Sequence, residues 1–454
     1  MKRREFLFGL SVAGASALNP ARAAESILQN IGIRGSIDAA ELGFRPDTLD
    51  DQSKIFSKLL AAASKSNQEI YLPPGDYIVS NLTLPKRVRI HGVPGASRII
   101  YGGDGHLFAA EDTELVEIEG VVFDGANRGL NEQSQGLLEG RRVPRFILSN
   151  CEIIGSEKNG ISLEGCAGRI EKSTISGAGD AGIWSVEGAG MTIADNEVRD
   201  CANGGILVHR WQEAHDGTMI TGNRVSRIGA KNGGTGQFGN GINVFRGNDV
   251  SASGNLVSDC AFSAIRFNSA SDAQIVNNNC KNSGETAIYS EFKFEGSLIS
   301  GNVVDGAANG ISVANFNEGG RLSVVANNIV RNLKLDGPYP ADAAGFGIGI
   351  AVEADTVVSG NVIENAPNIG LNIGWGPYMR DVSATGNIIR KCGEGIAVTV
   401  VEGAGKAVIN SNVLSENIRG AIFGHRWTDV VTSDMATSGN QGFETLTVEN
   451  NQAA

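Results

Sequence analysis

Three side chains able to transfer protons or carry charge come from two stretches with the same pattern. Arg266 lies in "SAIRFN" (263–268), and Tyr289 and Glu291 lie in "TAIYSE" (286–291). An arginine, a tyrosine and a glutamate on one face suit acid–base chemistry on a sugar chain. In a lyase, Arg266 or Tyr289 would remove a proton beside a uronate carboxyl group while the other neutralises charge.

A hydrolase is the alternative, and it needs two carboxylates flanking the scissile bond. Glu291 has no evident carboxylate neighbour, since Glu353 is expected at roughly 10 Å, at or beyond the separation that inverting enzymes use. His209 is the fourth catalytic candidate because imidazole changes charge near neutral pH. Its "HRW" motif recurs at 425–427, however, which also fits a turn motif or a second surface patch.

Two markers recur along the chain and predict the element that positions these residues. One is an asparagine shortly before an aliphatic residue, with Ser173 filling a missing step: Asn150, Asn196, Asn223, Asn255, Asn278, Asn302, Asn328, Asn361, Asn387 and Asn412. The other is Gly or Ala followed by Ile or Leu: the apolar residues are Ile161, Ile183, Ile206, Ile242, Ile265, Ile288, Ile311, Ile350, Leu371, Ile396 and Ile422. Short strands of period two without helices between them fit the coils of a parallel β-helix. We expect the asparagines to be structural, in tight turns that tolerate left-handed backbone.

Stacked coils bring distant residues together on one wall. The residues one and three positions after each apolar marker should face solvent, and coils repeat about every 5 Å. Arg266 should therefore touch Tyr289, and Asn268 should touch Glu291. The same wall supplies the predicted substrate-binding residues, which are Trp184, Arg210, Trp211, Asn243, Arg246, Asn268, Glu353, Asn372 and Trp375.

Two insertions leave the coil at the same turn. The number of residues from the marker Asn to the marker Gly is 18 after Asn223 and 21 after Asn328, against eight to ten in most coils. Loops longer than the local norm often carry function. We expect them to bracket a trough of roughly 19 Å, four coil steps long, on the wall that holds Arg266.

The N-terminal part should close the solenoid. "TLDDQSKIFSKLLAAASKS" (48–66) predicts an amphipathic helix with a capping box at Thr48 and Asp51 and an apolar face of Ile55, Phe56, Leu59, Leu60 and Ala63. It is followed by Pro74-Gly75-Asp76-Tyr77, which leads into strands. This arrangement resembles the pectate-lyase-like right-handed β-helix superfamily. Together with the paired Arg3 and Arg4 near the start of the chain, it looks like the twin-arginine-exported β-helix repeat proteins. The resemblance implies an all-β, single-stranded right-handed parallel β-helix with an N-terminal capping helix, over nearly all of residues 30–450.

The first 23 residues predict a twin-arginine signal peptide. Arg3 and Arg4 precede an apolar run that ends in Ala21-Arg22-Ala23, a small-x-small cleavage site. Its removal would take the net charge from −12 to about −15, which argues against a nucleic-acid partner. No apolar run of transmembrane length follows. The expected partners are thus a polysaccharide and, during export, the twin-arginine translocase, with a periplasmic or secreted location.

Residues 24–454 should form one β-helix domain, with regular coils over 150–425. Of the six cysteines, Cys201, Cys260 and Cys392 fall in one column on non-adjacent coils, too far apart to bridge, and we expect them to be buried. Cys151, Cys166 and Cys280 have no assignment from sequence.

These patterns predict an exported protein that acts on an extracytoplasmic polysaccharide, with a uronate-polymer lyase as the leading hypothesis. A non-catalytic glycan-binding or cell-envelope protein is the first alternative, and a glycoside hydrolase is the second. A fold does not dictate its chemistry. The paired-Asp motifs of polygalacturonases and the calcium-binding Asp cluster of pectate lyases are both missing from the sequence, so no motif establishes an enzyme activity. We expect no cofactor, and the sequence leaves a calcium ion open.

Overall fold

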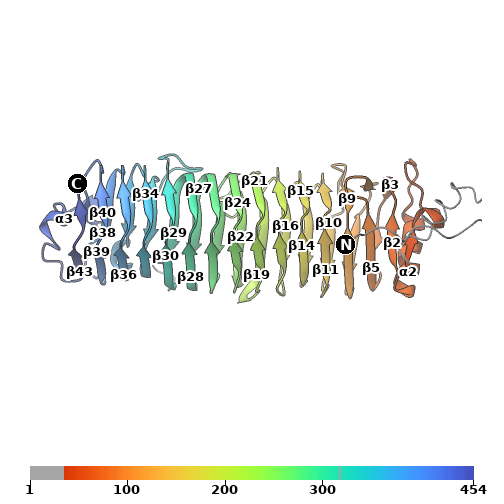
Figure 1. Cartoon of the computed structure of the whole chain (residues 1–454), viewed down its shortest axis with the longest axis horizontal. Helices are drawn as coiled ribbons and strands as arrows, with labels where there is room; N and C mark the ends of the chain where they lie inside the picture. The colour runs from red at the N-terminus through yellow and green to blue at the C-terminus, as the bar shows by residue number, and fades with distance from the viewer. Residues whose placement is uncertain (1–34, 316–318) are drawn as a thin grey trace, which may run out of the picture.

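A long cylinder of stacked coils makes up the protein, whose computed structural model describes residues 35–315 and 319–454 (Figure 1). All pairings between successive coils are parallel, so the chain is the right-handed parallel β-helix that the repeat predicts. The predicted signal peptide, residues 1–23, lies outside the described residues. In the described part, no helix is both long and apolar enough to cross a membrane.

Each coil contributes strands to three stacks that run the length of the cylinder. Stack A comprises β1 (Ser36–Asp38), β2 (Glu69–Leu72), β5 (Arg87–Gly92), β8 (Leu115–Glu119), β11 (Phe146–Ser149), β14 (Gly168–Glu171), β17 (Thr192–Ala194), β20 (Met219–Thr221), β23 (Ser251–Ser253), β26 (Ala273–Val276), β28 (Glu295–Ser300), β30 (Arg321–Ala326), β33 (Ala354–Ser359), β36 (Arg380–Thr385), β39 (Ala407–Asn410) and β43 (Leu446–Glu449).

Stack B follows the turn after each stack A strand. It comprises β3 (Gly75–Val79), β6 (Ser97–Tyr101), β9 (Val121–Asp124), β12 (Glu152–Ile154), β15 (Thr174–Ser176), β18 (Glu197–Arg199), β21 (Arg224–Ile228), β24 (Leu256–Cys260), β31 (Ile329–Arg331), β34 (Val362–Glu364), β37 (Ile388–Arg390), β40 (Val413–Ser415) and β44 (Gln452–Ala453).

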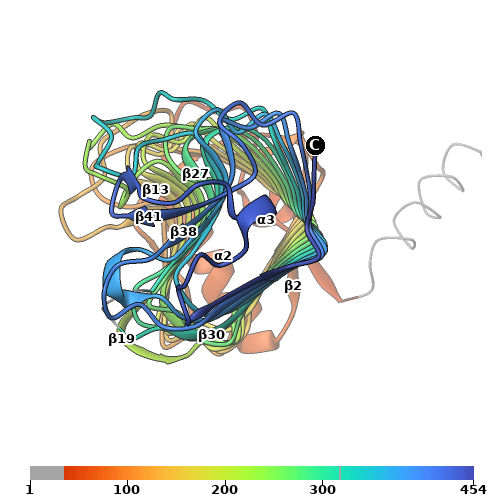
Figure 2. The same ribbon diagram turned by 90° about the vertical axis from the view of Figure 1, so that its left-hand side faces the viewer.

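Stack C carries the predicted site. It comprises β4 (Leu82–Thr83), β7 (Phe108–Glu111), β10 (Gly136–Arg141), β13 (Asn159–Glu164), β16 (Ala181–Val186), β19 (Gly204–His215), β22 (Asn240–Asn248), β25 (Ile265–Asn268), β32 (Ile348–Val352), β35 (Ile369–Ile373), β38 (Glu394–Thr399) and β41 (Ile422–Arg426). The long strands β27 (Asn279–Glu291) and β29 (Val303–Ala314) belong to stack B at their start and to stack C at their end. Viewed along the axis, the longer loops leave the coil on the side of β13, β38 and β41 (Figure 2).

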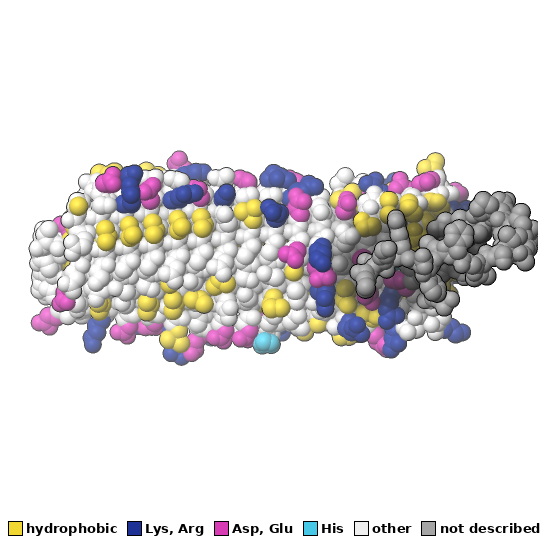
Figure 3. Space-filling view, in the orientation of Figure 1, with side chains coloured by type: hydrophobic (Ala, Val, Ile, Leu, Met, Phe, Trp, Pro, Cys, Tyr) yellow, Lys and Arg dark blue, Asp and Glu magenta, His cyan; other side chains and the backbone are white. Residues whose placement is uncertain are grey.

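The predicted apolar marker column is the register of stack C. Ile265 pairs with Ile242 and Ile288, and the column runs unbroken from Ile161 to Ile422 with side chains at most 1% exposed. Aliphatic side chains also form rungs on the outside of the last coils, visible as rows along the cylinder (Figure 3): Leu298, Val324, Val357 and Val408 on stack A, and Ile329, Val362, Ile388 and Val413 on stack B. Stacking of identical side-chain types at one position therefore extends to both faces of the strands.

The asparagine column is structural, as predicted, but for a different reason. From Asn196 onward, each ladder asparagine accepts bonds through its side-chain oxygen from the preceding ladder residue and donates its amide to a backbone carbonyl, as Asn278 does to Ala252. The left-handed residue is the one before it, such as Asn277 at φ 58°. The placement of Asn150 in the column was wrong by one residue. Asn150 is the left-handed residue, and Cys151 takes the ladder position, where its backbone N–H donates to Oγ of Ser173.

All six cysteines are free and buried, which confirms the expectation for Cys201, Cys260 and Cys392 and supplies the missing assignment for Cys151, Cys166 and Cys280. Burial raises the pKa of the Cys280 thiol to about 12. A thiol so far from ionising packs as a small apolar side chain.

A helix covers the N-terminal end of the cylinder, as predicted. It is α2 (Ser53–Ser66), preceded by the short 3-10 helix η1 (Ala40–Leu42), and it buries Phe56, Leu59, Leu60 and Ala63. The predicted start and capping box at Thr48 were wrong: the helix begins after Gln52, whose side chain instead bonds the backbone of Arg45, and Ile55 is 38% exposed. At the other end lie the hairpin strand β42 (Asp429–Val430), α3 (Met435–Ser438) and a last coil formed by β43 and β44.

Candidate functional site

The register of β25 and β27 places Arg266 beside Tyr289 and Asn268 beside Glu291, as the coil stacking predicts. The guanidinium carbon of Arg266 lies 5.1 Å from the centre of the Tyr289 ring, in a cation–π contact. The amide of Asn268 donates to Glu291 Oε1 at 2.7 Å. The four side chains thus form one cluster on stack C.

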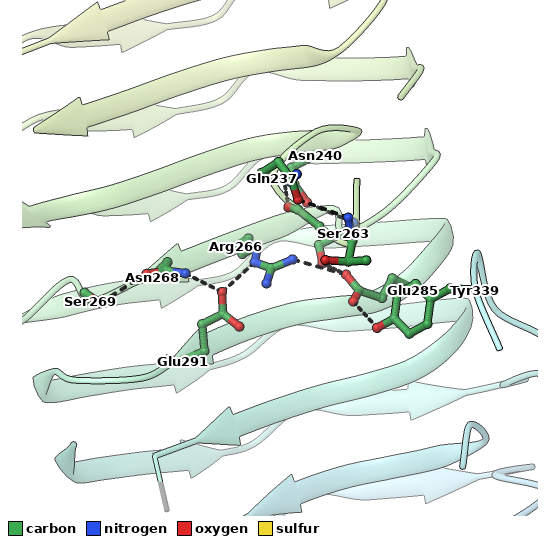
Figure 4. Close-up of polar contacts among 11 residues, drawn as sticks. Gln237, Asn240, Ser263, Arg266, Asn268, Ser269, Glu285, Glu291 and Tyr339 are labelled. Atoms are coloured by element: carbon green, nitrogen blue, oxygen red, sulfur yellow. Dashed lines mark hydrogen bonds and ion pairs between the residues drawn. The ribbon is translucent and has the colours of Figure 1, made fainter. Parts of the chain in front are cut away.

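A second glutamate, which the sequence patterns did not single out, completes this cluster (Figure 4). Arg266 Nε lies 2.6 Å from Glu291 Oε1, and its Nη1 lies 3.4 Å from Glu285 Oε2. Glu285 also accepts hydrogen bonds from Ser263 and from the hydroxyl of Tyr339. The expectation that Glu291 has no nearby carboxylate was therefore wrong, because one guanidinium holds two.

The insertions cover this cluster instead of standing beside an open trough. Tyr339 belongs to the second insertion, and Gly236 of the first lies so close to Arg266 that no β-carbon would fit there. The side chain of Arg266 is 11% exposed, and those of Glu285 and Glu291 are 3% exposed. The prediction that these residues face solvent was wrong, since loops from neighbouring coils fold over them.

Burial makes Tyr289 a poor base. Its pKa is raised by burial first and then by the negative charges of Glu291 and Glu285. Burial likewise raises the pKa of Glu285, against the hydrogen bond from Tyr339 and the charge of Arg266. At neutral pH, Tyr289 keeps its proton, and Arg266 is already paired with two acids.

His209 is neutral in its surroundings. Burial lowers its pKa to about 4, and the indole Nε1 of Trp184 lies 3.4 Å from its Nδ1. Its ring packs edge-on against Phe245, and its Nε2 has no hydrogen-bond partner among the described residues. A histidine that stays uncharged at neutral pH and has no carboxylate to orient it is a packing residue more than a catalyst.

Its neighbours in the predicted binding set have protein partners too. Arg210 pairs with Glu187 at 2.7 Å and with the fully buried Asp216 at 3.6 Å. Arg246 lies over the ring of Phe245 and donates to the backbone carbonyl of Trp211. Arg210 thus links β19 to the turn after β16, and Arg246 links β22 to β19.

Five of the nine predicted binding residues line two separate parts of the wall. Trp184 and Trp211 line the N-terminal hollow, of about 310 Å³, with Glu139, Arg141 and Glu164. Asn243 is 6% exposed and lines neither hollow.

On the other side of the Arg266 cluster, two adjacent hollows make up what we call the C-terminal trough. The first, about 390 Å³, runs from Thr286 and Tyr289 past Glu353 to Trp375, and the second, about 300 Å³, runs on to Trp427. They share six lining residues, which are Ala343, Ala344, Gly345, Ile348, Asn372 and Trp375. Glu353, Asn372 and Trp375 are thus the predicted binding residues that the first of these hollows brings together.

No group of three or more His, Cys, Asp or Glu side chains placed to hold a metal ion occurs within residues 35–315 and 319–454.

Residues 137–229 match the family model described as the right-handed β-helix region. The SPbeta prophage-derived uncharacterized protein YomE of Bacillus subtilis (strain 168) is 27% identical over 172 residues, which are 35% of this chain and 27% of YomE, so the chain matches about a quarter of that relative. The family model and the strand topology agree on a right-handed parallel β-helix, which confirms the fold that the resemblance implies.

Solved structures similar to this chain include the pre-mature bacteriophage phi29 gene product 12, with TM-score 0.49 and 13% identity over 91% of this chain and 60% of that one. The A-module of the Azotobacter vinelandii mannuronan C-5 epimerase AlgE6 has TM-score 0.46 and 14% identity, over 92% of this chain and 99% of the A-module chain. The catalytic unit of a GH87 α-1,3-glucanase from Streptomyces thermodiastaticus strain HF3-3 has TM-score 0.42 and 14% identity over 89% and 71%.

Proposed function

We propose that this protein binds a polysaccharide along the C-terminal trough, after export by the twin-arginine route. The observation that carries the proposal is that the two hollows are adjacent and share the lining around Trp375. Tyr289 and His425, which line the two ends of this stretch of stack C, lie on strands five coil steps apart, or about 24 Å. That length suits several units of an extended chain.

The lining has the chemistry that sugar rings require. Aromatic side chains offer flat apolar faces, and a few convergent polar groups fix orientation and specificity. Here Tyr289, Tyr339 and Trp375 supply the faces, and Asn309 and Asn372 supply amide donors and acceptors.

The charge of the first hollow of the trough favours an uncharged chain over a polyuronate. Between Thr286 and Trp375 the lining contains Asp342 and Glu353 and no lysine or arginine. Acidic side chains in the lining repel the carboxylates of a uronate polymer.

A glycan-binding role for this stretch therefore stands ahead of the lyase hypothesis. Proton abstraction by Tyr289 would require a phenolate next to two glutamates, and Arg266 is held by those same glutamates. We infer that Arg266, Glu285 and Glu291 fix the wall of the trough.

Affinity gel electrophoresis in soluble xylan, β-glucan and polygalacturonate tests the proposal. We expect retardation by a neutral polymer, lost in Trp375→Ala and kept in Trp211→Ala, a matched tryptophan in the N-terminal hollow. Retardation lost only in Trp211→Ala would move the site to that hollow, and no retardation by any of the polymers would refute the proposal. Growth of unsaturated-product absorbance with polygalacturonate, abolished in Tyr289→Phe, would restore the lyase hypothesis.

Export is tested separately by fractionating cells that express the full chain. We expect the protein in the periplasm or medium, and in the cytoplasm when Arg3 and Arg4 are both replaced by lysine.

A further inference from the structure

At the C-terminal end of the trough lies a polar cluster that neither the sequence patterns nor the comparisons assign. Glu394 begins β38, and its side chain is 1% exposed. Its Oε1 lies 2.7 Å from Nε2 of His425 on β41, and its Oε2 lies 3.5 Å from Nε of Arg419. One buried carboxylate thus holds a histidine and an arginine.

The carboxylate fixes which atoms of its partners remain available. Because Nε2 of His425 is bonded to Glu394, the free ring nitrogen is Nδ1, which makes no hydrogen bond to another described residue. Arg419 uses Nη2 on the backbone carbonyl of Asn368, which leaves Nη1 without a partner among the described residues. A base oriented by a buried carboxylate is the arrangement that general-base catalysis requires.

These two groups line a hollow that a ligand can enter. His425 and Arg419 line the 300 Å³ hollow together with Trp375 and Trp427, whose rings meet edge-on at 5.5 Å. The hairpin of β41 and β42 presents Trp427 and Thr428 over the opening. The imidazole is 13% exposed and the arginine is 51% exposed, so solvent and ligand reach them from the hollow.

We propose that this cluster is an esterase centre that removes acyl groups from the polysaccharide bound in the trough. His425 Nδ1 takes a proton from water as the water oxygen bonds to the ester carbonyl carbon. Arg419 stabilises the negative charge that develops on the carbonyl oxygen. The tetrahedral intermediate then breaks its bond to the sugar oxygen, which takes the proton back from His425, giving a free hydroxyl and a carboxylic acid.

Ester cleavage fits these groups better than glycosidic cleavage. Hydrolysis of a glycosidic bond uses two carboxylates on opposite sides of the sugar. The lining of this hollow has one, Glu394, which is buried and committed to His425 and Arg419. One oriented base and one cationic donor are the parts that acyl transfer to water needs.

The experiment measures p-nitrophenyl acetate hydrolysis and acetate release from O-acetylated xylan by the full chain. We expect His425→Ala to lower kcat/KM about 10²–10⁴-fold and added imidazole to restore part of it. Glu394 acts as a positioning residue, so Glu394→Gln should lower kcat with KM unchanged. His215→Ala, which removes an exposed histidine in a distant coil, is the control and should match the wild type.

Turnover of neither ester, or equal rates in His425→Ala and the wild type, overturns the proposal. His425→Asn, with thermal unfolding measured for each variant, separates loss of chemistry from loss of fold. The identity of the natural substrate rests on the proposed function. The two proposals can fail independently, because Trp375→Ala tests polymer binding, whereas hydrolysis of the small ester tests the cluster alone.

Discussion

The hydroxyl of Tyr339 lies 2.5 Å from Glu285 Oε1, although 54 residues separate them in the chain. Tyr339 belongs to an insertion, and Glu285 lies on β27 in the wall beneath it. The ring of Tyr339 also packs against Phe262 and Phe346 at 6.2 and 5.6 Å. This contact ties the loop to the charge cluster and forms one edge of the C-terminal trough.

Tyr339→Phe should loosen the loop without unfolding the coil. It removes a hydrogen bond to a buried carboxylate, a loss of roughly 1.5–3 kcal/mol. We expect faster cleavage within residues 333–345 under limited proteolysis and weaker polymer binding. Leu335→Ala, at a 61% exposed position in the same loop, is the control. Equal protease resistance of Tyr339→Phe and the wild type would contradict the role given to this contact.

Arg266→Met should destabilise the protein much more than loss of an exposed arginine. It leaves Glu285 and Glu291 buried without their cation, and breaking a buried pair costs about 3–5 kcal/mol. The same change at Arg227, which pairs with Asp200 at the surface, should have little effect. Urea unfolding at neutral pH measures both, and comparable losses in the two variants would argue against a buried network.

The destabilisation by Arg266→Met should shrink as pH falls. The pKa of Glu285 is already raised by burial, and losing the positive charge of Arg266 raises it further. A carboxyl group whose pKa is higher in the folded than in the unfolded state binds protons preferentially in the folded state, so the folded state gains stability as pH falls. The difference from the wild type should thus be largest at neutral pH and smaller near pH 5. A difference that grows on acidification would show that the lost contact is not electrostatic.

The fold could be predicted from the sequence because its signals repeat. Ile265 and Ile288 occupy the same position in successive coils, and that register alone places Arg266 beside Tyr289. Glu285 and Tyr339 gave no such signal, since their meeting depends on how an insertion folds over the wall. The asparagine signal itself was ambiguous, because Asn also suits the left-handed position one residue earlier.

The position of Glu394 was equally hidden from the pattern. It lines the trough at the start of its strand, at a position held by Ile369 in the preceding coil and by asparagine in others, such as Asn240 and Asn309. The recurring "HRW" fits both a turn motif and a second surface patch, and the structure distinguishes its two copies. His209 is enclosed by Trp184 and Phe245, whereas His425 reaches a carboxylate.

The native protein should resist thiol alkylation. Burial raises the pKa of Cys151, Cys201 and Cys280 to about 12, so the reactive thiolate is scarce at pH 8. We expect no iodoacetamide labelling of these residues in the folded protein and complete labelling in denaturant. Mass spectrometry measures the extent of labelling in both. Rapid labelling of the native protein would show that the coils open locally.

Two adjacent asparagines give a matched test of the ladder. Asn277 is exposed and left-handed at φ 58°, a conformation that glycine adopts freely, so Asn277→Gly should change stability little. Asn278 is buried and bonds Asn255, Asn302 and Ala252, so Asn278→Gly leaves several buried polar groups without partners, at about 1–3 kcal/mol each. Thermal unfolding should show a clear loss for Asn278→Gly alone. Equal losses for the two variants would mean that the turn backbone, and not the amide ladder, sets the stability of this corner.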